Sequence, residues 1–277
     1  MSQQYSPAGF NLLPPVVKNL LIINGLFYLA TLSLDTAYGI NLVNILGLHY
    51  FKSDLFRPYQ FVTYMFLHGG FSHVAMNMFA LWMFGYLLEN VWGSKRFLTY
   101  YMITGIGAAI VQVFMQWIDI SSVQAAASAY GANPTLDGFI GFVRHHYPVY
   151  YNAPGPLRSF INEWTLAKNS PGYAGQSLDY IGQLLKLQMD VPTVGASGAV
   201  YGILLAFGMM FPNMLVYVYF LFPIKAKWIV LIYGALELYS GISNNPGDDV
   251  AHFAHLGGMI FGFFLILYWK KKTGLYS

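Results

Sequence analysis

The chain has 277 residues, of which 56% are hydrophobic and 9% are charged, with a net charge of +3 and no cysteine. An ordinary soluble domain has about 25% charged residues, so this composition excludes a soluble protein and predicts a polytopic helical membrane protein. The lack of cysteine excludes a disulfide framework, thiol catalysis and a Cys-ligated metal. No basic cluster is larger than Lys270–Lys272, so nucleic acid is not expected as a partner.

Six apolar stretches approach the roughly 20 residues that a membrane-spanning helix needs. They are 17–35, 70–89, 97–118, 197–212, 226–242 and 250–269. We therefore predict an all-α polytopic membrane protein, a bundle of six transmembrane helices that forms a single domain over 1–277. Basic residues in alternate short loops place both termini in the cytoplasm by the positive-inside rule. These residues are Lys95 and Arg96, Lys225 and Lys227, and Lys270–Lys272.

The segment 119–190, between the third and fourth predicted spans, is polar and rich in proline, so we predict an extramembrane insertion there. Within it, apolar residues recur at helical spacing at Leu178, Ile181, Leu185 and Met189. This spacing predicts an amphipathic helix over 177–189 that lies on the membrane or over the bundle. On the predicted topology the insertion is on the outer face.

The second predicted span carries His73 and Asn77, which are four residues apart and share one helix face. Both side chains can donate hydrogen bonds, as an oxyanion hole requires. His68 precedes them, and we expect it at the water-facing mouth of the site.

The fourth predicted span begins with Gly195-Ala196-Ser197-Gly198. The two glycines allow tight turns and close approach of a peptide. At the start of a helix the backbone N–H groups lack intrahelical partners, so those beside Ser197 are available to an oxyanion. By itself, a serine at such a position is more often a helix cap or a small packing residue.

The sixth predicted span carries His255 in Ala254-His255-Leu-Gly-Gly258, and imidazole is suited to take a proton from serine at neutral pH. At about 1.5 Å per residue, Ser197 and His255 both lie about 8 Å below the outer membrane surface. The GxxxG pattern of Gly258–Gly262 allows another helix to approach closely, and Gly202 and Ala206 on the fourth span offer a matching small surface. We therefore expect a Ser–His pair.

No membrane-embedded carboxylate is near either residue in sequence, so we expect a catalytic dyad without a third member. Glu237, in the fifth span, is interpreted as a structural residue that hydrogen-bonds between helices rather than as part of an ion pathway. His252 raises the alternative of an all-histidine metal site with His68, His73 and His255. That alternative is disfavoured because the chain has no HExxH motif and no nearby carboxylate, and we expect neither a metal nor a cofactor.

Together these motifs resemble the rhomboid family of intramembrane serine proteases. The resemblance covers about 57–118 and 191–269 and comprises the GxSG motif at 195–198, the AHxxGxxxG motif at 254–262, and His68 followed by the HxxxN motif at 73–77. It implies that Ser197 is the nucleophile, that His255 is the general base, and that His73, Asn77 and the Ser197 backbone form the oxyanion hole.

The resemblance also implies supporting roles. Tyr201 matches a tyrosine that packs against the catalytic imidazole, and Glu89 matches a structural acid at the inner end of the second span. The implied activity is a serine endopeptidase, a hydrolase that cleaves transmembrane segments of proteins near the outer face of the lipid bilayer without a cofactor. The implied location is a bacterial inner (plasma) membrane.

Two features depart from the family pattern. Tyr59-Gln60 stands where a Trp-Arg pair is usual in the first outer loop, and the insertion is longer than in typical bacterial members. A non-catalytic rhomboid relative is one alternative function, although that class typically lacks the serine or the histidine. A transporter or channel is another, disfavoured because the sequence has neither repeat symmetry nor a track of ionisable residues across the bilayer. The sequence identifies neither the substrate, the oligomeric state nor the role of the insertion.

Overall fold

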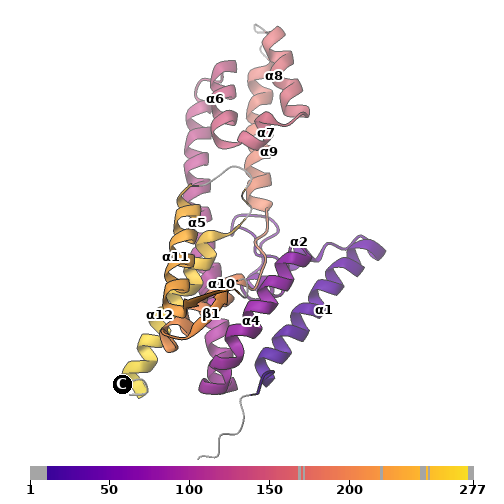
Figure 1. Ribbon diagram of the computed structural model, residues 1–277. Coiled ribbons are helices and arrows are strands. Elements are labelled where there is room, and N and C mark those ends of the chain that lie inside the picture. Colours follow the sequence, from indigo (N-terminus) through magenta and orange to yellow (C-terminus); the bar gives the residue numbers. More distant parts are fainter. Residues whose placement is uncertain are drawn as a thin grey trace, which may run out of the picture.

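The computed structural model describes residues 11–167, 170, 172–218, 221–243, 248 and 250–273. It shows a bundle of long helices with a group of shorter helices at one end (Figure 1). Each of the six predicted stretches contains a helix, and the all-α class is confirmed. These helices are α1 (Pro15–Tyr38), α4 (Phe71–Trp92), α5 (Ser94–Gly131), α10 (Ser197–Met210), α11 (Ala226–Ser243) and α12 (His252–Thr273).

Within the described ranges, four helices are long and apolar enough to cross a membrane, namely α1, α4, α5 and α12. The chain is therefore an integral membrane protein. Helix α10 is apolar but has 14 residues, and α11 has 18. Crossing of the membrane by these two helices, and hence the total of six spans, stays a prediction.

Helix α10 lies at the centre of the bundle, in contact with α4, α5, α11 and α12. It is apolar on every side, as expected for a helix surrounded by others. Glycines allow the close contacts: a Cβ on Gly258 of α12 would lie 1.8 Å from the carbonyl oxygen of Gly198. The expected close packing of the fourth and sixth predicted spans is confirmed. Gly202, however, faces Thr104 of α5 rather than α12.

The start of α1 is fixed by Glu89, near the end of α4. Its carboxylate accepts hydrogen bonds from the backbone N–H groups of Val16 (2.9 Å) and Val17 (2.8 Å) and from the Ser94 hydroxyl (2.6 Å). A carboxylate at a helix N-terminus satisfies otherwise unpaired donors and complements the helix dipole. This contact agrees with the structural role expected for Glu89.

The segment between α1 and α4 folds into the short helices α2 (Leu42–Leu46), α3 (Gln60–Thr63) and η1 (Tyr64–Phe66). Gln60 is fully buried and organises this loop, because its amide donates to the carbonyls of Ile45 (3.1 Å) and Leu55 (3.0 Å). Between α10 and α11, a hairpin that the sequence analysis did not predict pairs β1 (Leu215–Val218) with β2 (Phe222–Lys225).

The insertion, residues 119–190, is helical and forms an apolar core of its own. Its helices are the end of α5, α6 (Leu136–His146), α7 (Pro148–Asn152), α8 (Pro156–Leu166) and α9 (Gly172–Asp190). Large apolar residues from these helices pack together, including Tyr130, Phe139, Phe142, Phe160, Trp164 and Ile181. Figure 1 shows these helices together at the end of the bundle opposite the start of α1 and the end of α12.

The structure adds one feature to this region and corrects one expectation. The helix that carries the third predicted span continues past 118, because α5 runs without a break for 38 residues, about 57 Å at the usual helical rise, and its end belongs to the insertion. The predicted helix at 177–189 exists within α9, but it packs against α5 and the core of the insertion rather than on the membrane or the bundle. Its apolar face is buried there, at Ile181 and Leu184.

The base of the insertion is attached to the loop after α2. Leu48 and Thr193 form a backbone bridge, and the Ser53 hydroxyl donates to Asp190 (2.6 Å). Lys186 pairs with Asp54 (2.8 Å) and with Asp190 (3.3 Å). The Ser53 hydrogen bond and the Lys186 charge lower the pKa of the Asp190 carboxyl. Asp190 is therefore ionised when it contacts Ser53 and Lys186.

Candidate active site

Ser197 is the first residue of α10, where the bundle brings four helices together. Gly195, two residues earlier, has φ of 131°, a conformation that residues with a side chain rarely adopt. Its N–H donates to the carbonyl of Tyr64 (3.0 Å), which fixes the chain just before the helix. Because Ser197 begins the helix, the first-turn N–H groups beside it have no intrahelical acceptor and are available to an anion.

The Ser197 hydroxyl lies 2.7 Å from Nε2 of His255, on α12. His255 is buried, with 7% of its surface exposed, and Ser197 is half-buried. The ring of Tyr201, one turn after Ser197, stacks on the imidazole with centroids 4.2 Å apart and planes 7° apart. The side chains predicted as nucleophile, base and supporting aromatic are thus in direct contact.

Glu237 of α11 contacts residues of α10 and α12, as expected for a residue that hydrogen-bonds between helices, but it also lies beside the Ser–His pair, where no carboxylate was expected. One of its carboxylate oxygens lies 2.9 Å from Nδ1 of His255, the ring nitrogen that does not face Ser197. The contact is an ion-pair distance rather than an aligned hydrogen bond, since Nδ1 makes no directed hydrogen bond to any described residue. A buried carboxylate therefore does stand beside the Ser–His pair.

Two neighbours hold the Glu237 carboxylate in place. The Tyr201 hydroxyl donates to Oε1, and Nδ1 of His252 lies 2.6 Å from Oε2. Nε2 of His252 is in turn 3.0 Å from Asp248. His252, considered in the sequence analysis as a candidate metal ligand, is thus joined to Glu237. The sequence did contain a signal for Glu237. It is a carboxylate inside an apolar stretch, and such a residue in a membrane protein often marks a functional site.

His73 and Asn77 are one turn apart on α4, a helix that packs against α10. The side chains of His73 and Ser197 both lie beside Gly195. A Cβ on that glycine would be 2.9 Å from Nε2 of His73 and 3.5 Å from the Ser197 hydroxyl. Asn77 is buried one turn further along the helix. His73 is therefore close to the serine side chain.

His68 is not at a water-facing mouth as expected. It is buried, with 3% of its surface exposed, and its ring contacts the edge of His73 at a centroid distance of 5.0 Å. Neither ring nitrogen has a hydrogen-bond partner among the described residues. Its position behind His73 suits it to support that ring.

One group of residues here has the types and spacing to hold a metal ion. The ligand atoms of Glu237, His252 and His255 lie within 4.8 Å of one another. A metal was disfavoured from the sequence partly because no carboxylate is nearby. In the folded chain Glu237 is nearby, so that argument does not hold. The all-histidine set considered from the sequence is not what assembles, since His68 and His73 lie outside this group.

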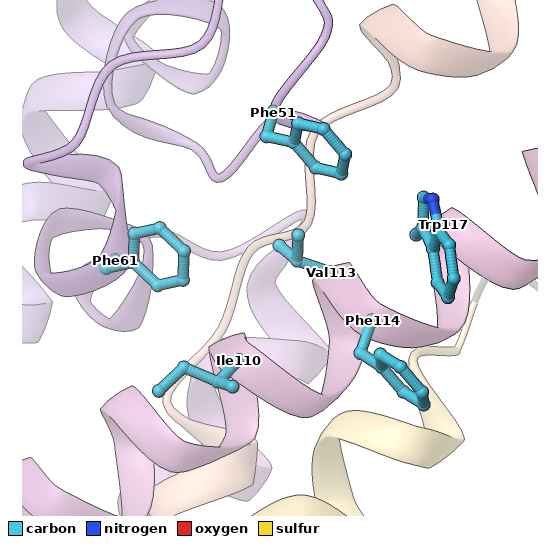
Figure 2. A pocket seen from close by; sticks show the side chains of 6 residues that line it. All are labelled: Phe51, Phe61, Ile110, Val113, Phe114 and Trp117. Atoms are coloured by element: carbon cyan, nitrogen blue, oxygen red, sulfur yellow. The ribbon is translucent and has the colours of Figure 1, made fainter.

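An apolar pocket of about 310 Å³ lies apart from Ser197. Phe51 and Phe61 face one side of it, and α5 supplies the other, as Figure 2 shows. The α5 residues are Ile110, Val113, Phe114 and Trp117. This pocket has no acid, base or nucleophile in its lining and so does not compete with the Ser197 site as a place for chemistry.

Comparison with known proteins gives a match to the Rhomboid domain over residues 55–148 and 149–272. The chain is 29% identical over 110 residues to Rhomboid-like protein 11, chloroplastic, of Arabidopsis thaliana, which covers 39% of each protein. It is 25% identical over 199 residues to Rhomboid protein 1, mitochondrial, of Saccharomyces cerevisiae, over 71% of this chain and 38% of that protein. It is 38% identical over 58 residues to Rhomboid protease AarA of Providencia stuartii, over 21% of each. The chain thus spans about two fifths or less of the length of these relatives.

Proposed function

The chain belongs to the rhomboid family, and from that membership and the geometry of the site we propose that it is an intramembrane serine endopeptidase. One observation carries the proposal: the Ser197 hydroxyl lies 2.7 Å from Nε2 of a buried histidine, His255, inside a membrane protein. A serine becomes a competent nucleophile when a base within hydrogen-bond reach can take its proton. The substrates are transmembrane segments of other proteins.

In the first half of the reaction, His255 Nε2 takes the Ser197 proton while Oγ forms a bond to the carbonyl carbon of the peptide. The π electrons of the carbonyl move to its oxygen, which becomes an oxyanion. We assign His73, Asn77 and the backbone N–H of Ser197 as the donors to this oxygen, and such donors stabilise the charge most in a site that excludes water. Tyr201 keeps the imidazole in plane by stacking on it.

The intermediate then collapses. The C–N bond breaks, and the protonated His255 donates its proton to the leaving amine, which gives an acyl-enzyme on Ser197. A water molecule gives a proton to His255 and attacks the ester carbon in the second half-reaction. Breaking of the C–O bond returns the proton to Ser197. Protons and electrons balance without a metal or cofactor.

The location of the site defines where such cleavage occurs. The insertion lies at the end of the bundle opposite the start of α1 and the end of α12 (Figure 1). Ser197 is the first residue of α10, seven residues after the end of the insertion, and His255 is in the first turn of α12. With both termini in the cytoplasm of a bacterial cell, the orientation favoured by the positive-inside rule, cleavage takes place near the outer face of the inner membrane.

The test needs no knowledge of the substrate. Detergent-solubilised protein is treated with a fluorophosphonate probe, which reacts covalently with activated serines, and labelling is followed by in-gel fluorescence. We expect the wild type to be labelled, and we expect Ser197→Ala and His255→Ala to be unlabelled although they remain folded.

Matched controls are Ser128→Ala and His145→Ala, because both residues are exposed on the insertion and neither contacts the site. Both variants should be labelled like the wild type. Labelling of Ser197→Ala would locate the reactive serine elsewhere, and a folded wild type that is not labelled would favour a non-catalytic member of the family.

A further inference from the structure

We propose that Glu237 is a positioning residue for His255, so that the site works as a Ser197–His255–Glu237 triad rather than as a dyad. This inference rests on the proposed function, because it assigns how the base of that reaction is held. Three helices supply the three residues: α10 carries Ser197, α12 carries His255 and α11 carries Glu237. No two of them are neighbours in sequence.

The first step concerns the tautomer of the imidazole. For Nε2 to accept the serine proton, the hydrogen of the neutral ring must be on Nδ1. Nδ1 is buried, and Glu237 Oε2 lies 2.9 Å from it. A carboxylate at this distance favours the tautomer with hydrogen on Nδ1 and stabilises the positively charged imidazolium that forms when Ser197 attacks.

The second step concerns what fixes the carboxylate. Tyr201 donates to one oxygen of Glu237, and His252 lies 2.6 Å from the other. Tyr201 therefore contacts the imidazole through its ring and the carboxylate through its hydroxyl. This double contact couples the position of Glu237 to that of His255.

The third step concerns charge. Among the residues that the structure describes, the titratable groups around His255 and Glu237 are Asp248 before α12, His252 at its start, Tyr201 on α10 and His73 on α4. The Asp248 carboxylate lies on the far side of His252, 3.0 Å from its Nε2. Glu237 is therefore the carboxylate next to the imidazole of His255, while Asp248 acts through His252.

A second acid in the bundle shows what a purely structural carboxylate looks like. Glu89 is also buried, but its partners are two backbone N–H groups and the hydroxyl of Ser94, none of which belongs to the site. Glu89 thus provides a matched control: its loss should affect stability without changing the chemistry of His255.

The experiment measures the rate of fluorophosphonate labelling against pH for the wild type, Glu237→Gln, Glu237→Asp and Glu89→Gln, with a chelator present. Glutamine has the shape of glutamate but no charge. We expect Glu237→Gln to be labelled at least about tenfold more slowly, a modest change beside the ~10⁴-fold loss that a comparable substitution causes in soluble triads.

The pH dependence of the labelling rate distinguishes a positioning role of Glu237 from a purely structural one. The labelling rate should fall at acidic pH, where His255 is protonated, and we call this part of the profile the acidic limb. A neutral amide stabilises the imidazolium less than a carboxylate does, so the acidic limb of Glu237→Gln should move to lower pH. Glu237→Asp keeps the charge and should restore part of the rate and keep the limb near its wild-type position. Glu89→Gln should lower the melting temperature while the limb stays in place.

Folding is checked by thermal unfolding of each variant in detergent. A Glu237→Gln protein that is labelled at the wild-type rate with an unchanged limb would overturn the triad while leaving the Ser197–His255 pair in place. A slow Glu237→Gln protein with an unchanged limb and a melting temperature as low as that of Glu89→Gln would assign Glu237 a structural role. An unlabelled wild type would instead remove the proposed function, and the triad with it.

Discussion

Gly198 and Gly258 are in backbone contact: a Cβ on Gly258 would lie 1.8 Å from the Gly198 carbonyl oxygen. Ser197 directly precedes the first glycine, and His255 lies one helical turn before the second. The approach of α10 and α12 at this point therefore sets the distance between the hydroxyl and the imidazole. Small residues at helix interfaces have this effect in membranes, where close backbone approach replaces the hydrophobic effect between helices.

Substitution of Gly258 should therefore disrupt both stability and the site. In Gly258→Ala the new methyl group meets backbone, which cannot move aside as a flexible side chain would, so we expect a loss of about 1–3 kcal/mol and much slower probe labelling. The measurement is thermal unfolding in detergent together with the labelling rate. Gly25→Ala in α1 is the control, because a Cβ there meets nothing within 4 Å; an equal melting temperature for the two variants would contradict the prediction.

Tyr201 has two contacts that can be separated. Tyr201→Phe keeps the ring stacked on His255 but removes the hydroxyl that donates to Glu237, whereas Tyr201→Leu removes both contacts. We expect a graded loss of labelling rate, with the leucine variant slower than the phenylalanine variant. If the two variants were equally slow, the hydroxyl would account for the whole effect and the stacking would contribute nothing.

The oxyanion assignment of Asn77 predicts a loss that leaves the Ser–His pair intact. Removal of one oxyanion-hole donor typically lowers the rate about 10²–10³-fold. We therefore expect the probe to label Asn77→Ala slowly, while the melting temperature of this variant changes little. Labelling at several probe concentrations distinguishes slower chemistry from weaker probe binding. A wild-type maximal rate in Asn77→Ala would exclude it from the oxyanion hole.

The insertion should unfold without the bundle, because its apolar core is separate from that of α10 and its neighbours. Phe139 is fully buried at its centre, and Phe139→Ala should cost about 3–5 kcal/mol within that core. We expect new protease cleavage sites between 132 and 176, with the bundle still protected. Ile203→Ala is the opposite control, since Ile203 is fully buried in the core of the bundle, on the helix that carries Ser197, and its loss should affect labelling rather than protease cleavage of the insertion.

The helices and the reactive pair could be predicted from local patterns in the sequence. Runs of about 20 apolar residues locate the long helices, and the glycine-flanked motifs around Ser197 and His255 identify the pair that the structure joins. Glu237 could not be placed in the same way. It is 18 residues before His255, on another helix, and its contact depends on how α11 packs against α12.

The continuation of α5 into the insertion was not predicted for a different reason. Residues 119–131 were assigned to the polar extramembrane insertion, and no helix was predicted there. No glycine or proline lies between 119 and 130, however. Ile120 is buried, and Val123 and Tyr130 join the apolar core of the insertion. Polarity marks where a helix leaves the bilayer, whereas helix-breaking residues mark where it ends.

The continuous course of α5 has a mechanical consequence. Ala108 of α5 lies against Gly198, next to Ser197, and about 35 Å of uninterrupted helix separates it from the top of α5 at Gly131. A rod without a hinge transmits a sideways force at one end as a tilt at the other. Whatever binds or pulls on the insertion therefore exerts torque on the helices that carry the nucleophile and the base, across the surface of the membrane.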